Sequence, residues 1–88
     1  MHTRTWHVTI NLFEKDGHTR AEAVLRTDGG PELRHEAVAR LHPGDRDVPE
    51  IGDELAVARA LSELSHRLLH AAADDIEQLT HEPVDLPG

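Results

Sequence analysis

The sequence predicts an α+β fold in which three antiparallel strands are followed by one long C-terminal helix. Up to Leu41 the chain alternates apolar and polar side chains and is divided by two glycine-containing turns, the pattern of half-buried strands joined by hairpins. From Gly52 onward the apolar residues recur every three or four positions, which is typical of an amphipathic helix. The chain has 88 residues, the length of one small domain, which we expect to span residues 1–88.

The first predicted strand covers residues 5–14, where Trp6, Val8, Ile10 and Leu12 alternate with Thr5, His7, Thr9, Asn11 and Phe13. A turn follows at residues 15–18, because Gly17 can adopt a positive φ. The second predicted strand covers residues 19–27, although its alanines and glutamate also suit a helix. Alternation places alanines and a leucine on one face of this strand and its arginines on the other.

A strong turn signal, Asp28-Gly29-Gly30-Pro31, precedes the third predicted strand at residues 32–41. Taken alone, this segment also fits a helix. After two hairpin turns, a third antiparallel strand is the better interpretation. Residues 42–52 contain two prolines and two glycines and are predicted to form a loop.

The predicted helix covers residues 53–80 and would be about 42 Å long. Acidic Asp53 and Glu54 suit its N-terminus, and Pro83 ends it. Residues Asp74 and Asp75 mark the place where a bend is expected. We expect residues 81–88 to form a disordered tail. The apolar stripe of the helix comprises Val57, Leu61, Leu64, Leu68, Ala72, Ile76 and Leu79.

Such a helix is longer than a sheet of short strands is high, so part of its stripe would overhang. A second copy of the chain could cover that part, which favours a homodimer. The predicted core comprises Trp6, Val8, Ile10, Leu12, Ala23, Leu25, Ala39, Leu41, Leu61, Leu64, Leu68 and Ile76.

Composition excludes several classes of protein. There is no cysteine, which excludes disulfide scaffolds, thiolate nucleophiles and cysteine-ligated zinc. No run of apolar residues is long enough to span a membrane, and polar residues interrupt the N-terminal segment where a signal peptide would be apolar. We therefore expect a cytoplasmic protein that does not contact membranes.

Charge is distributed unevenly along the chain. Residues 1–46 carry seven basic and seven acidic groups, whereas residues 47–88 carry two basic and ten acidic groups, a net charge of −8. The acidic half would repel a phosphate backbone, so we expect no DNA binding. A solvated helix face that keeps the protein soluble is the simplest interpretation of this charge.

No combination of residues indicates catalysis, a cofactor or a metal. The only serines, Ser62 and Ser65, lie in the predicted helix, without an evident catalytic partner. His66, His70 and Asp74 share one helix face at metal-ligand spacing. That face is expected to be exposed and solvated, so we predict no catalytic, cofactor-binding or metal-binding residues.

Arginines are the candidate partner-binding residues. On the predicted strands they share the face away from the core, where they would form either a basic strip or cross-strand pairs with glutamates. We expect no aromatic side chain on that face to stack on bases. A further arginine in the loop would either anchor the start of the helix through acidic neighbours or contact a partner. The candidates are Arg20, Arg26, Arg34, Arg40 and Arg46.

Three stretches carry a resemblance to a known family: "HTRAEAVLR", "ARLHPGDRDVPEIGDELAVARAL" and "DDIEQLTHEPV". Over roughly residues 5–84 the chain resembles small actinobacterial proteins of unknown function described as double-stranded-RNA-binding-domain-like, some of them mycobacterial proteins induced in dormancy. Their fold is similar to that of ribosome hibernation-promoting factors. The resemblance implies a β-β-β-α domain, a homodimer and a role in stress or dormancy, and it carries no catalytic residues.

The chain departs from these relatives in two ways. A usual double-stranded-RNA-binding domain begins with a helix and binds through lysine-rich segments, whereas this chain begins with a predicted strand and has a single lysine. Hibernation factors are basic where they contact ribosomal RNA, whereas the helical half here is acidic.

Two hypotheses about function follow. The first is a non-enzymatic stress or dormancy regulator that associates with the ribosome or ribosomal RNA. The second is a protein-interaction module that uses its acidic helix and makes no contact with nucleic acid.

Overall fold

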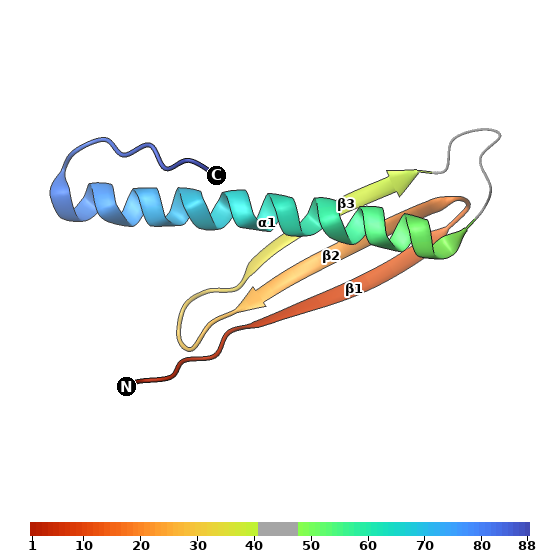
Figure 1. Cartoon of the computed structure of the whole chain (residues 1–88), viewed down its shortest axis with the longest axis horizontal. Helices are drawn as coiled ribbons and strands as arrows, with labels where there is room; N and C mark the ends of the chain where they lie inside the picture. Colours follow the sequence, from red (N-terminus) through yellow and green to blue (C-terminus); the bar gives the residue numbers. More distant parts are fainter. Residues whose placement is uncertain (41–47) are drawn as a thin grey trace.

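The computed structural model describes residues 1–40 and 48–88. Strands β1 (His7–Lys15), β2 (His18–Arg26) and β3 (Leu33–Arg40) form an antiparallel sheet in the order β1-β2-β3, and helix α1 (Pro49–Thr80) crosses one face of it (Figure 1). This confirms the predicted α+β fold and its order of elements. In the described ranges, no helix is long and apolar enough to cross a membrane.

A two-residue turn joins β1 to β2. Asp16 and Gly17 both have positive φ, 50° and 75°, which is the backbone twist that matches two antiparallel strands. The two strands then pair without interruption from Lys15↔His18 to His7↔Arg26. The sequence prediction of this turn is confirmed, although β1 begins two residues later than predicted.

Paired residues of an antiparallel sheet share a face, so the register defines both faces. The face toward α1 carries Val8, Ile10 and Leu12 of β1 opposite Leu25, Ala23 and Ala21 of β2. Ala37 and Ala39 of β3 lie on the same face. The alternation in the sequence therefore assigned the side chains to the correct faces.

Helix α1 begins four residues earlier than predicted. Val48 is the extended N-cap residue and Pro49 follows as the first helical residue, a position where proline loses no hydrogen bond. The helix continues without a break to Thr80, through the site of the predicted bend. It ends at His81, which is left-handed with a φ of 58° and donates its backbone N–H to the Glu77 carbonyl.

Small side chains dominate the core. Alanines on β2, β3 and α1 allow the helix to lie close to the sheet, and a few larger residues fill the space around them. The buried core residues are Ala21, Ala23, Leu25, Ala39, Ala56, Ala60 and Leu64, with Ile10, Val57 and Leu68 partly buried against them.

The core prediction is wrong for five residues, which are exposed in the structure. Trp6, Val8 and Leu12 are exposed because α1 packs against β2 and β3 and leaves β1 largely uncovered. Leu61 is exposed because α1 meets the sheet through Ala56 and Ala60, and each residue turns the helix surface by about 100°. Ile76 is exposed because it follows Leu68, the last residue of α1 packed against the core, in the part of the helix that extends past the sheet (Figure 1). Leu41 lies outside the described residues.

The C-terminal segment is not the free tail that the sequence predicts. After His81 the chain turns back along α1 (Figure 1), and the backbone N–H of Val84 donates to Glu77 Oε1 at 2.8 Å. The part of α1 that extends past the sheet is therefore covered on one side by residues of the same chain.

Candidate protein-interaction surface

The face of the sheet away from α1 carries the predicted arginines. The register places Arg20 and Arg26 of β2 on this outer face, together with Arg34 and Arg40 of β3. Their predicted common face is confirmed. Arg46 lies outside the described residues, so the two roles predicted for it stay predictions.

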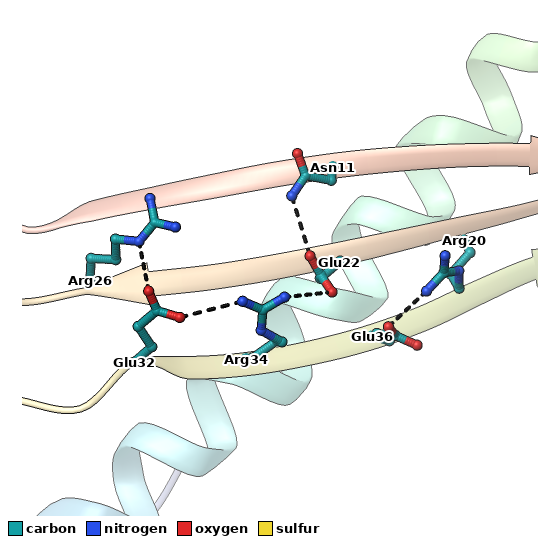
Figure 2. A network of polar contacts seen from close by, with 7 residues as sticks. All are labelled: Asn11, Arg20, Glu22, Arg26, Glu32, Arg34 and Glu36. Carbon is teal, nitrogen blue, oxygen red and sulfur yellow. Dashed lines mark hydrogen bonds and ion pairs between the residues drawn. The ribbon is translucent and has the colours of Figure 1, made fainter.

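Glutamates pair with three of these arginines (Figure 2). Arg34 contacts Glu22 at 3.0 Å and Glu32 at 3.4 Å, and Glu32 also accepts a hydrogen bond from Arg26 Nε at 2.9 Å. Separately, Arg20 pairs with Glu36 at 2.8 Å. Cross-strand pairing, the alternative to a free basic strip, is therefore what the structure shows for these three.

Electrostatics within the network favour its charged form. Hydrogen bonds from Arg34 and from the Asn11 side-chain amide hold the pKa of Glu22 below its ordinary value of 4.5. The same contact with Glu22 raises the pKa of Arg34. The arginines and glutamates of the outer face therefore stabilise one another in their charged forms.

A buried valine lies among these polar side chains. Val24 is only 2 % exposed although it is on the outer face, where Thr9 and Arg34 are its cross-strand partners. Glu22 and Arg26 flank it along β2. The aliphatic stems of such long side chains can cover apolar surface, which explains how Val24 is buried on this face. The sequence pattern placed Val24 outside the core.

The expectation of no aromatic side chain on this face is wrong. Phe13 of β1 lies opposite Arg20, and the Arg20 guanidinium lies 4.3 Å from the centre of its ring. Alternation along β1 would have revealed Phe13, which shares the parity of Thr9 and Asn11. One side of its ring is already occupied by the Arg20 guanidinium, so that side is not free to stack on a base.

The helix side of β1, which the sequence predicts to be buried, is exposed in the structure. Trp6, Val8 and Leu12 are each about half exposed, with Ile10 partly buried between them. We call these four residues the β1 apolar face. Val8, Ile10 and Leu12 share one face of β1, whose other edge pairs with β2, and Trp6 immediately precedes the strand. Apolar side chains gathered in this way typically mark a binding surface.

One flank of α1 extends this apolar surface. Arg59 reaches the β3 side, where its Nη1 donates to the Val38 carbonyl at 3.0 Å. Leu61 follows two residues later, about 200° around the helix, and so belongs to the flank above β1. Leu61 is exposed, which leaves an apolar residue of α1 facing the same side as the β1 apolar face.

Two histidines of α1 lie beside one depression, apart from Asp74. His66 and His70 line a shallow cavity of about 160 Å³ with Leu69, Ala73 and the returning C-terminal segment. Asp74 instead lines a neighbouring depression with Glu77 and His81. In the part of the chain that the structure describes, no group of three His, Asp or Glu side chains is arranged to hold a metal ion.

The comparisons with known proteins concern nearly the whole chain. A family described as Rv2632c-like matches residues 4–85. The uncharacterized protein MT1780 of Mycobacterium tuberculosis (strain CDC 1551 / Oshkosh) is 53% identical over 81 residues, covering 92% of this chain and 85% of the relative. The uncharacterized protein Rv2632c of Mycobacterium tuberculosis (strain ATCC 25618 / H37Rv) is 43% identical over 81 residues, covering 92% and 86%.

A solved structure agrees with these sequence relatives. The crystal structure of Rv2632c superposes with a TM-score of 0.84 at 41% identity, covering 94% of this chain and 98% of the other. The mycobacterial relatives are those that the sequence resemblance implies, while the likeness to double-stranded-RNA-binding domains and to hibernation factors stays a prediction. With a family match over most of its residues, the chain belongs to the Rv2632c-like family.

Proposed function

We propose that this chain is a non-enzymatic protein-interaction module that binds through the β1 apolar face and makes no contact with nucleic acid. One observation carries the proposal: the edge strand β1 presents Val8 and Leu12 to solvent, and Trp6 is exposed just before the strand, beside a helix that leaves them about half exposed. Leaving such side chains in water costs free energy that a protein partner would recover on binding.

The outer face supports the exclusion of nucleic acid. Binding to a phosphate backbone depends on cations that can release its counterions. Arg20, Arg26 and Arg34 already contact carboxylates, so RNA would have to break those pairs. Helix α1 adds seven acidic residues against two basic ones, a net charge of −5, which also disfavours RNA.

Several features support a function without catalysis. Every buried side-chain nitrogen or oxygen in the described residues has a hydrogen-bond partner, so none of them points to a missing ligand. The two depressions described above along α1 are open, unlike the enclosed apolar pockets of most small-molecule sites. The stress or dormancy setting implied by the resemblance is part of the proposal, and protein abundance in growing and starved cells tests it.

A photo-crosslinking residue placed on β1 tests the binding face. Leu12 and Val38 have similar exposure but lie on opposite faces and on the two opposite edge strands of the sheet. In cells of the source organism, a photoreactive residue at position 12 should crosslink to protein and the same residue at position 38 should not. Equal crosslinking from both positions would contradict the proposal.

Titration with ribosomes and with a short RNA duplex tests the alternative, a ribosome-associated regulator. That function would have to use the outer face, where Phe13 and Arg20 lie. Binding should be absent at both about 50 mM and about 200 mM salt, whereas true RNA binding would weaken steeply between the two. Salt-dependent binding that is lost in Arg20→Ala would replace our proposal with the ribosomal one.

A further inference from the structure

The two edges of the sheet differ in how well they are protected. Natural edge strands are blunted by prolines, bulges, inward charges or a covering element. At the β3 edge, Arg59 bonds the Val38 carbonyl and α1 packs against the strand. Strand β1 has no proline and no bulge in its nine-residue pairing with β2. Its helix-side residues are apolar as far as Leu12. These features leave the free edge of β1 able to pair with another strand.

The apolar pattern of β1 is symmetric. Val8, Ile10 and Leu12 are evenly spaced on one face. In an antiparallel pairing about a two-fold axis at Ile10, Val8 lies opposite the partner subunit's Leu12, and Ile10 lies opposite its own copy. Directly opposed side chains are the units that stabilise a sheet, and here each of these three apolar residues meets another apolar residue.

We propose that the occupant of the β1 apolar face is a second copy of this chain, whose β1 pairs antiparallel with β1 across a two-fold axis at Ile10. The two three-stranded sheets then form one six-stranded sheet with both helices on the same face. This inference rests on the proposed function, because it names the partner of the same surface. A two-fold interface uses the same patch on both subunits.

Charge selects this arrangement over a dimer formed through the helices. Two copies of α1, each with a net charge of −5, would repel each other if packed together. In the paired sheets each helix lies over β2 and β3 of its own subunit, so the two helices are about four strand spacings, roughly 19 Å, apart. That is about two Debye lengths at physiological salt. The strands that meet are nearly neutral, since Glu14 and Lys15 are the only Lys, Arg, Asp or Glu residues of β1.

Sedimentation velocity with two matched variants tests the interface. Val8 and Phe13 are each 47% exposed on the same strand but lie on opposite faces. Wild type should sediment as a dimer. Val8→Lys should raise the dimer Kd by about tenfold or more, because a charge would be buried between the copies. Phe13→Lys should change the Kd much less, and circular dichroism should show both variants folded.

The single tryptophan and the absence of cysteine provide two further measurements. Trp6 emission should shift to shorter wavelength as wild-type concentration rises, and it should stay constant in Val8→Lys. Under oxidation, Ile10→Cys should form a disulfide-linked dimer, because directly opposed Cα atoms lie about 4.5–5.5 Å apart in a sheet. Asn11→Cys and Val38→Cys should crosslink far less. The cysteine variants keep the test valid even if a lysine variant fails to fold.

The outcomes separate this inference from the proposed function. A monomer at every concentration, or a disulfide that forms at Val38 on β3 and not at Ile10, would overturn the inference. A monomer that still crosslinks another protein from position 12 leaves the proposed function standing. Salt-dependent RNA binding would overturn the proposed function whether or not the chain dimerises.

Discussion

The comparison of Leu64→Ala with Leu61→Ala tests how α1 faces the sheet. Both residues are leucines in the middle of one helix, and the sequence pattern places both in the core. In the structure Leu64 is 3% exposed and Leu61 is 40% exposed. The two substitutions change helix propensity equally, so a difference in stability reports the burial of each side chain.

The structure gives a magnitude for each substitution. Truncating a buried leucine to alanine lowers the free energy of unfolding by about 2–5 kcal/mol, depending on how far the neighbouring side chains collapse into the cavity. Leu64 lies in a core built mainly of alanines, which have no rotamers with which to fill a void. We therefore expect Leu64→Ala to cost about 3–5 kcal/mol, and Leu61→Ala to cost about 1–1.5 kcal/mol, from lost transfer energy alone.

Urea unfolding followed by circular dichroism measures both values. Each variant should be measured at two protein concentrations tenfold apart, because coupling to self-association makes apparent stability depend on concentration, whereas the loss of a core contact does not. Equal costs for the two variants at both concentrations would refute the packing described above and restore the apolar stripe that the sequence predicts.

Three further substitutions have defined outcomes in thermal unfolding. Gly52→Ala should lower Tm, because the new Cβ would lie 2.8 Å from Thr19 Oγ1. This steric cost should outweigh the helix propensity of alanine, which exceeds that of glycine by up to about 1 kcal/mol. Adding Thr19→Ala removes the close contact, so the double variant should be more stable than Gly52→Ala. His81→Gly should be more stable than His81→Ala by roughly 1 kcal/mol, because His81 has a φ of 58°. Glu22→Gln should destabilise at neutral pH. That deficit should vanish as pH falls below 4.5, because the pKa of Glu22 is lowered in the fold by Arg34 and its contribution is lost on protonation. A deficit that persists in acid would contradict this.

The sequence alone was sufficient for the elements and for the two faces of the sheet. A period of two assigns each strand residue to one face or the other, and the register confirmed that assignment for the helix-side residues of all three strands. The turn at Asp16-Gly17 followed from glycine chemistry. The start of α1 was placed too late because Pro49 and Gly52 suggested a loop, whereas proline is favourable in a first helical turn.

For the candidate surfaces, the sequence showed which residues share a face but not which of them would meet. Arginines and glutamates alternate along β2 and β3, so a free basic strip and a paired network were both consistent with the pattern. The choice depended on cross-strand register, which placed Glu22 within reach of Arg34 and Glu36 within reach of Arg20. Val24 is buried although it is on the outer face, where its cross-strand partners Thr9 and Arg34 come from other strands.

Only the tertiary structure decided what α1 covers. A helical period identifies an apolar stripe, but its rotation and its position across the sheet depend on how closely the two surfaces can approach. Alanines at positions 21, 23 and 39 of the sheet and at 56 and 60 of the helix allow close contact over β2 and β3. Because one helix is narrower than three strands, that contact left Val8 and Leu12 of β1 on the correct face but about half exposed, with Ile10 packed only partly against the core.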